Sequence, residues 1–199
     1  MPTRSHFPKA RTALLLVDTI NPFDFEGGRA FARRSVRVAR AIAALRDRAS
    51  RAGLPVIYVN DNLGKWRSDM RSLVEHCTRD GMPGAPVVQI LEPRKADYVV
   101  LKSTLSGFYQ TPLDTMLRLG GVATVIITGF AADNCVLFTA ADAYMRDYRL
   151  VVPRECIGAK TPEALRRALT TMSDLFGAKT EPSTRLRLSR ERKKRRRRR

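Results

Sequence analysis

The stretch TVIITGFAADNCVLFTA, residues 124–140, changes character twice within seventeen positions. Its first part is a short apolar run rich in β-branched side chains, which is typical of a buried strand. Small residues follow from Gly129, and a helical pattern begins near Cys135. A strand that passes through a tight turn into a helix is the repeating unit of α/β proteins. Here that unit delivers a cysteine to the start of a helix.

The same unit recurs along the chain. Continuous apolar runs, which indicate parallel strands covered on both faces, occupy residues 14–17, 56–59, 98–101, 125–127 and 150–152. Helical patterns lie near residues 38–49, 65–79, 111–119, 135–147 and 162–176. The alternation predicts a single α/β domain over residues 1–184, in which helices cover both faces of a doubly wound parallel sheet.

The C-terminal end of the chain is strongly basic. Residues 185–199 carry +10 of the formal net charge of +18, with 11 basic residues and one acid. Such a run repels itself and buries nothing, so we expect a disordered tail over 185–199. It could bind nucleic acid through phosphate contacts, although a solvated extension without a partner is the simpler interpretation.

The cysteines and the hydropathy suggest where the protein works. Cys77, Cys135 and Cys156 are odd in number and widely spaced, which does not suggest a disulfide framework. No apolar run reaches the roughly 18 residues that cross a bilayer. We therefore expect a cytoplasmic protein without a membrane partner.

Three reactive groups follow the ends of predicted strands. Asp18 follows the first strand, Lys102 the third, and Cys135 lies beyond the fourth. Ligands of open α/β sheets bind beyond the carboxyl ends of the strands, so these groups are predicted to converge there. Taken singly, Asp18 could cap a turn, Lys102 could lie on the surface and Cys135 could fill the core. Together they favour a catalytic site.

The three groups make chemical sense as a nucleophile and its helpers. A helix N-terminus and a nearby ammonium both lower the pKa of a thiol, which predicts a reactive Cys135. A carboxylate within reach could take the thiol proton and later return it to a leaving group. Histidine is the usual base, but His6 lies near the terminus and His76 in a predicted surface helix. Asp18 is therefore the better base.

Three segments resemble the isochorismatase-like cysteine hydrolase family. They are LLLVDTINPF (residues 14–23), VVLKSTLSGFYQTPLD (99–114) and VIITGFAADNCVLFTAADAYMRDY (125–148). The resemblance covers about residues 11–180 and implies a parallel six-stranded sheet of order 3-2-1-4-5-6. It also implies a dimer or tetramer.

The resemblance assigns roles to residues. It implies that Asp18, Lys102 and Cys135 are the catalytic residues, with Cys135 forming a covalent intermediate. It further implies a cis peptide between Phe130 and Ala131. The backbone N–H groups of Ala131 and Cys135 would then form the oxyanion hole.

Departures from the family pattern narrow the function. Nicotinamidase members carry an Asp-x-His motif that holds a metal, whereas the chain after the second strand has no histidine before His76. We therefore expect no metal and no cofactor. Members that cleave the vinyl ether of isochorismate generally lack the cysteine, so Cys135 favours a C–N bond.

The sequence thus predicts a metal-independent cysteine amidohydrolase acting on a small amide, carbamoyl or ureido compound. One alternative is an isochorismatase-type vinyl-ether hydrolase, which would release no ammonia or amine. Another is a nucleic-acid-associated protein that uses the basic tail. Further side chains are candidates for the substrate pocket, with ordinary packing or turn roles equally open for each: Asn21, Phe23, Asn60, Trp66 and Phe108.

Overall fold

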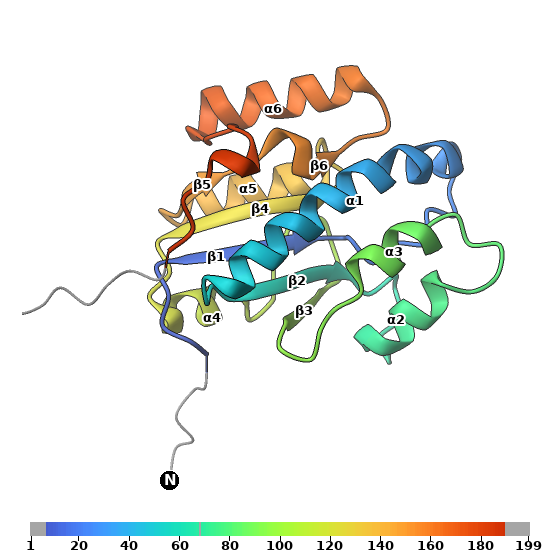
Figure 1. The fold of residues 1–199 in the computed structure, drawn as a ribbon, viewed down its shortest axis with the longest axis horizontal. Coiled ribbons are helices and arrows are strands. Elements are labelled where there is room, and N and C mark those ends of the chain that lie inside the picture. The colour runs from blue at the N-terminus through green and yellow to red at the C-terminus, as the bar shows by residue number, and fades with distance from the viewer. Residues whose placement is uncertain (1–6, 68, 190–199) are drawn as a thin grey trace, which may run out of the picture.

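The computed structural model describes residues 7–67 and 69–189, within which strands and helices alternate (Figure 1). The strands of this part are β1 (Thr12–Val17), β2 (Val56–Asp61), β3 (Tyr98–Lys102), β4 (Thr124–Phe130), β5 (Arg149–Val151) and β6 (Ile157–Gly158). The helices are α1 (Gly28–Arg51), α2 (Met70–Cys77), α3 (Ala85–Leu91), α4 (Leu113–Gly120), α5 (Cys135–Tyr144) and α6 (Pro162–Phe176). The described part also contains two short 3₁₀ turns, η1 (Arg154–Cys156) and η2 (Ser183–Arg185).

The six strands form one parallel sheet in the order β3-β2-β1-β4-β5, with β6 paired to β4. The predicted α/β fold and six-stranded sheet are confirmed. The predicted order is right for the first five strands and wrong for the last, because β6 does not extend the sheet beyond β5. The three residues of β5 pair only with the first half of β4, and β6 pairs with Gly129 and Phe130 at its far end.

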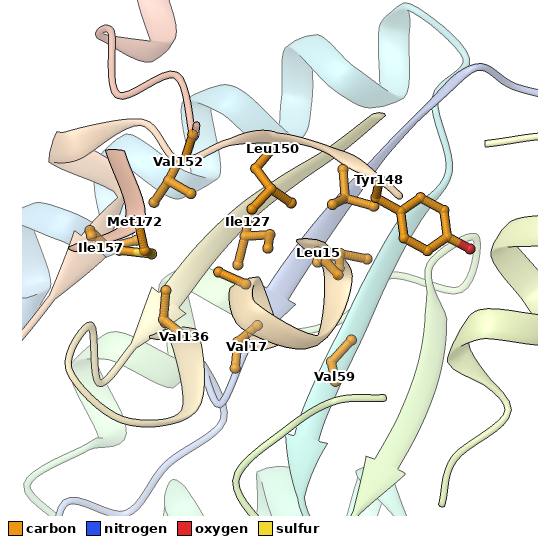
Figure 2. Packing of buried hydrophobic residues seen from close by; sticks show 14 of the residues in the cluster. Leu15, Val17, Val59, Ile127, Val136, Tyr148, Leu150, Val152, Ile157 and Met172 are labelled. Carbon is orange, nitrogen blue, oxygen red and sulfur yellow. The ribbon is translucent and has the colours of Figure 1, made fainter. Parts of the chain in front are cut away.

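Both faces of the sheet are buried, as the continuous apolar runs require. Alternate residues of a strand point to opposite faces. Ala13, Leu15 and Val17 accordingly enter one core, while Leu14 and Leu16 enter the other. The first core contains buried residues of α4, α5 and α6, and the second those of α1, α2 and α3. Figure 2 shows the first core, where side chains from the strands meet Val136 of α5 and Met172 of α6.

The helices follow the predicted pattern, with α2 and α5 shorter than predicted and larger differences at α1 and α3. α1 begins ten residues before the predicted start at residue 38, because Phe31, Ala32 and Ser35 extend its buried stripe toward the N-terminus. α3 was missed because its seven residues give too short a pattern. α6 begins as predicted, with Pro162 in its first turn and the Thr161 hydroxyl accepting a hydrogen bond from the Ala164 N–H at 3.1 Å.

The domain continues past the predicted boundary at residue 184. Leu186 and Leu188 pack against the second core. The Arg48 guanidinium donates hydrogen bonds to the carbonyls of Ser183 and Leu186, each at 2.7 Å. The expectation of a disordered tail from residue 185 is therefore wrong for this segment. Residues 190–199, on which the predicted nucleic-acid contacts largely depend, lie outside the described residues. In the described part of the chain no helix is long and apolar enough to cross a membrane.

Candidate active site

Three chemically distinct groups meet at the carboxyl edge of the sheet. Asp18 follows β1, Lys102 ends β3, and Cys135 is the first residue of α5. The Lys102 Nζ lies 2.8 Å from the Asp18 Oδ2 and 3.6 Å from the Cys135 Sγ. One ammonium thus bridges a carboxylate and a sulfur that are 117 positions apart in the sequence, so the structure brings all three predicted catalytic residues together.

Further contacts fix the carboxylate and the ammonium. The Asp61 N–H donates to the Asp18 Oδ1 at 2.6 Å, and Lys102 donates to the Thr104 carbonyl at 2.9 Å. The Asp61 carboxylate also lies near the ammonium, with its Oδ2 3.6 Å from the Lys102 Nζ. The Lys102 side chain is fully buried. Because a buried charge is stable only when it is paired, these contacts explain how a lysine can lie inside the domain.

Burial and pairing shift the proton affinities of the pair. Burial raises the pKa of the Asp18 carboxyl, and the Lys102 ammonium opposes that rise. Burial alone would lower the pKa of Lys102, but the negative charge of Asp18, with a smaller contribution from Asp61, outweighs burial and raises that pKa. Asp18 is thus a stronger proton acceptor than an ordinary aspartate, beside a lysine that holds its proton.

Cys135 behaves differently from the expectation. Burial raises the pKa of its thiol to about 12, the negative charge of Asp18 adds to the rise, and the Lys102 ammonium opposes it. The predicted lowering of this pKa is therefore wrong for the unliganded site. The start of α5 and the lysine are present as expected, but desolvation and the neighbouring carboxylate outweigh them. With a pKa this high, the thiol is neutral at rest.

The turn between β4 and α5 brings backbone close to the cysteine. Gly129 has φ +118°, and a Cβ at this position would lie 1.9 Å from the Val17 carbonyl oxygen, so only glycine fits. The peptide bond between Phe130 and Ala131, which follows, is cis, as the resemblance implies. Among the described residues no acceptor is found for the backbone N–H of Ala131 or Cys135. Both N–H groups are free to receive a ligand oxygen.

A cavity of about 460 Å³ opens over these groups. Three aromatic residues, Phe25, Phe31 and Phe130, line it, and so does Lys160, whose Nζ lies 4.5 Å from the centre of the Phe25 ring. This volume suits a small ligand. The residues that line the cavity are Asp18, Asn21, Phe25, Phe31, Phe130, Ala131, Asp133, Asn134, Cys135 and Lys160.

Only one of the five predicted pocket residues, Asn21, lines this cavity. Phe23 is buried behind it, in edge-to-face contact with Phe31 and Phe130. The Asn60 amide is occupied by the backbone of Ile20, accepting from its N–H and donating to its carbonyl, each at 2.9 Å.

The other two predicted pocket residues lie elsewhere. Phe108 is buried in the first core, where it packs against Tyr148. Trp66 is 81% exposed and lines a separate cavity of about 200 Å³. Neither Phe108 nor Trp66 therefore lines the cavity over Cys135, since loops after strand ends point in directions that their sequence does not specify. The cavity that Trp66 lines is also lined by Lys102, and a substrate contact of Trp66 stays a prediction.

Sequence reasoning missed Phe25, Phe31 and Lys160. Lys160 follows β6, a strand of only two residues that no hydrophobic pattern reveals. Its one available signal was its position shortly after the apolar pair Cys156 and Ile157.

The residues after β2 do not fit a metal site of the nicotinamidase type. The Asp61 carboxylate pairs with Lys102 and accepts a hydrogen bond from the Leu63 N–H at 2.6 Å. The Asn62 side chain accepts one from the Gly64 N–H at 2.9 Å, and Leu63 offers no ligand atom. Across residues 7–67 and 69–189, no group of three or more His, Cys, Asp or Glu side chains is arranged to hold a metal.

Comparison with known proteins gives one consistent result. Residues 12–181 match the family model of the isochorismatase domain. The chain is 38% identical over 170 residues to YaaI, an uncharacterized isochorismatase family protein of Bacillus subtilis (strain 168), covering 85% of this chain and 93% of that protein. It is 33% identical over 200 residues to the ureidoacrylate amidohydrolase RutB of Methylobacterium radiotolerans, covering 84% of this chain and 75% of that one.

A solved structure agrees with these relatives. The crystal structure of N-carbamoylsarcosine amidase from Thermoplasma acidophilum is similar with a TM-score of 0.68 and 31% sequence identity. The alignment covers 88% of this chain and 98% of that one.

Proposed function

The chain belongs to the isochorismatase family of hydrolases, and from this membership we propose that it cleaves the C–N bond of a small amide, carbamoyl or ureido compound. The relatives described above as an amidohydrolase and an amidase support a C–N bond over a vinyl ether. One observation carries the proposal: a single buried ammonium lies 2.8 Å from the Asp18 carboxylate and 3.6 Å from the Cys135 sulfur, and both Asp18 and Cys135 line one cavity.

The first half of the proposed reaction forms an acyl-enzyme. Asp18 takes the proton of the Cys135 thiol, and the sulfur attacks the substrate carbonyl carbon. The carbonyl oxygen becomes an oxyanion, toward which the N–H groups of Ala131 and Cys135 donate. One such donor is typically worth about 3 kcal/mol of activation free energy. Asp18 then returns its proton to the substrate nitrogen, the C–N bond breaks, and ammonia or an amine leaves.

The second half restores the enzyme. Asp18 takes a proton from a water molecule, whose oxygen attacks the thioester carbon. The C–S bond breaks, and the proton on Asp18 returns to the sulfur, so Cys135 becomes a thiol again. Lys102 stays protonated throughout, and its ammonium stabilises the negative charge while that charge is on Asp18 or on the Cys135 sulfur. A resting thiol with a pKa of about 12 fits this scheme, because the thiolate forms only as the substrate reacts.

We further propose that the substrate carries a carboxylate. Lys160 supplies a cation at the edge of the cavity, held against the Phe25 ring, and the walls next to it are aromatic. Ureidoacrylate and N-carbamoylsarcosine, named for two relatives, both combine a carboxylate with a carbamoyl group. A ligand of this class would place its carbamoyl carbon at Cys135 and its carboxylate toward Lys160.

The test is a screen for ammonia release over carbamoyl and ureido acids and their uncharged amides. We expect at least one carboxylate-bearing compound to be hydrolysed, and the Cys135→Ser variant to lose at least about a thousandfold of that rate. Turnover that persists unchanged in Cys135→Ser would refute the nucleophile. Preference for the uncharged amides would refute the role of Lys160.

Two further properties belong to the same proposal. The cysteines are free in the described structure, which supports a reducing cytoplasm.

Large apolar side chains are exposed on α5, directly after it and on α6. An exposed apolar surface of this kind favours a dimer or tetramer, and light scattering would measure the mass of the assembly. The exposed side chains are Phe138, Tyr144, Met145 and Leu175.

A further inference from the structure

Asp61 and Lys102 are neighbours by the construction of the sheet. They stand opposite each other in the parallel ladder between β2 and β3, each as the last residue of its strand. The Asn62 N–H donates to the Lys102 carbonyl at 2.9 Å, which continues the ladder past both residues. The sheet itself thus sets the distance of 3.6 Å between the Asp61 Oδ2 and the Lys102 Nζ.

The Asp61 carboxylate is also held in orientation. Its Oδ1 accepts from the Leu63 N–H at 2.6 Å, which leaves the Oδ2 directed at the ammonium. The backbone N–H of the same residue donates to Asp18 at 2.6 Å. Asp61 therefore contacts both charged members of the site, one through its backbone and the other through its side chain.

The charges around Lys102 change during the reaction. At rest two carboxylates, Asp18 and Asp61, face the ammonium. Once the thiol proton has moved to Asp18 and the sulfur has bonded to the substrate carbon, Asp18 and Cys135 are both neutral. At that stage Asp61 is the one anionic side chain, among the described residues, that still pairs with Lys102. A fully buried ammonium without any partner would tend to lose its proton.

We propose that Asp61 is a positioning residue of this reaction: its carboxylate keeps the Lys102 ammonium charged and in place while Asp18 carries the proton taken from Cys135. The inference rests on the proposed function for its role in turnover, but the coupling between Asp61 and Lys102 can be measured without a substrate.

Few groups face the Lys102 ammonium, so the carboxylate of Asp61 contributes appreciably to its electrostatic environment. The groups that face its Nζ are the carboxylates of Asp18 and Asp61, the Cys135 sulfur and the Thr104 carbonyl. Lys65 lines the neighbouring cavity and adds positive charge on that side. Burial lowers the pKa of Lys102, and the carboxylates of Asp18 and Asp61 raise it above its ordinary value.

The experiment uses Asp61→Asn, which keeps the shape of the side chain and removes its charge. Asp97→Asn is the matched control, because Asp97 directly precedes β3 and its removal takes one carboxylate from the opposite end of the same strand. The titration of Lys102 is followed by NMR of its ¹³Cε in the unliganded protein, with the signal assigned from Lys102→Met. Circular dichroism defines the pH range over which each variant stays folded.

We expect the Lys102 pKa to fall by about one unit or more in Asp61→Asn and to stay unchanged in Asp97→Asn. With a hydrolysed amide, kcat should fall about tenfold in Asp61→Asn, while KM stays within about twofold. Asp61→Glu keeps the charge, and we expect it to retain the wild-type titration of Lys102.

An unchanged Lys102 titration in folded Asp61→Asn overturns the inference, as does an equal shift in Asp97→Asn. If Asp61→Asn does not fold, the Asp61→Glu titration decides in its place: a pKa lowered as far as expected for the uncharged side chain overturns the inference. A wild-type protein that hydrolyses no compound of the proposed class would instead refute the proposed function, and the titration would still report on Asp61.

Discussion

Burial raises the pKa of Asp18 and Cys135 and lowers that of Lys102. It favours the neutral forms of Asp18, Lys102 and Cys135 alike. Pairing restores the charge of Lys102, because carboxylates lie within 4 Å of its ammonium. Cys135 has the lysine on one side and a carboxylate on the other, so its thiol stays neutral. The resting site therefore holds a buried ion pair beside an uncharged nucleophile.

This arrangement gives a test with Asp18→Asn. Because the charge of Asp18 contributes to the raised pKa of Cys135, its removal should lower that pKa and increase the thiolate fraction at pH 8. We expect Cys135 to be alkylated by iodoacetamide at least about tenfold faster in Asp18→Asn than in the wild type, while amide hydrolysis is lost.

The other thiols provide the internal control for this measurement. Cys77 and Cys156 are fully buried, and burial raises the pKa of each to about 12, so both should react only after unfolding. Alkylation that is slower in Asp18→Asn than in the wild type would contradict the described electrostatics.

Sequence patterns could identify the reactive residues but not their proton affinities. Asp18, Lys102 and Cys135 each follow a recognisable strand, so their convergence followed from the topology of a parallel sheet. The pKa of Cys135 depends on how closely Asp18 approaches and how little water reaches the sulfur. Neither quantity is encoded in the local pattern around a cysteine.

At the level of elements, the junction of β4 and α5 is the most constrained part of the fold. β4 pairs with β1 so closely at Gly129 that a methyl group there would overlap the Val17 carbonyl. The same pairing holds the turn that carries Ala131 and Cys135. Strand pairing in the centre of the sheet therefore determines the geometry in which a substrate carbonyl would be bound.

Substitution of Gly129 measures this constraint. We expect Gly129→Ala to lower the free energy of unfolding by more than about 3 kcal/mol, through steric overlap with backbone atoms that cannot move aside. Gly121→Ala is the control, since Gly121 also has a positive φ, +71°, but has open space around it. It should cost only about 1 kcal/mol. Urea unfolding of both variants gives the comparison, and equal losses would contradict the close approach of β1 and β4.

Elements with long, regular patterns were predictable, and short ones were not. The five apolar runs all became strands, because each is continuous and flanked by polar or Gly and Pro residues. β6 has two residues and α3 has seven, so each is too short for its hydrophobic pattern to repeat recognisably. Because Lys160 follows β6, the sequence did not predict its position at the cavity either.

At the scale of the whole molecule, the segment that follows α6 packs back against the domain. The segment through Leu188 returns to the second core, where Arg48 of α1 binds two of its carbonyls. The basic composition predicted a free tail here, although leucines alternate with arginines over residues 185–188. Packing of Leu186 and Leu188 shows that part of this segment belongs to the domain.

Two truncations separate packing from charge. Deletion of residues 185–199 should lower the free energy of unfolding by about 2–4 kcal/mol more than deletion of residues 190–199. The longer deletion also removes two partly buried leucines and the carbonyl of Leu186 that Arg48 binds. Thermal or urea unfolding of the two proteins provides the measurement. Equal stability would show that residues 185–189 contribute nothing to the domain.

The residues that line the cavity come from two kinds of segment, those beside the central strands and α5 and those in connections between elements. The reacting atoms of the cavity belong to Asp18, which directly follows the central strand β1, and to Cys135, which begins α5 directly after β4 and its turn. Phe25 and Lys160, by contrast, lie in connections between elements, and substitutions there disturb no ladder. Substrate selectivity can therefore change between related enzymes while the catalytic residues stay the same. A protein engineer could exchange the connections that carry Phe25 and Lys160 to accept new substrates and retain the hydrolytic chemistry.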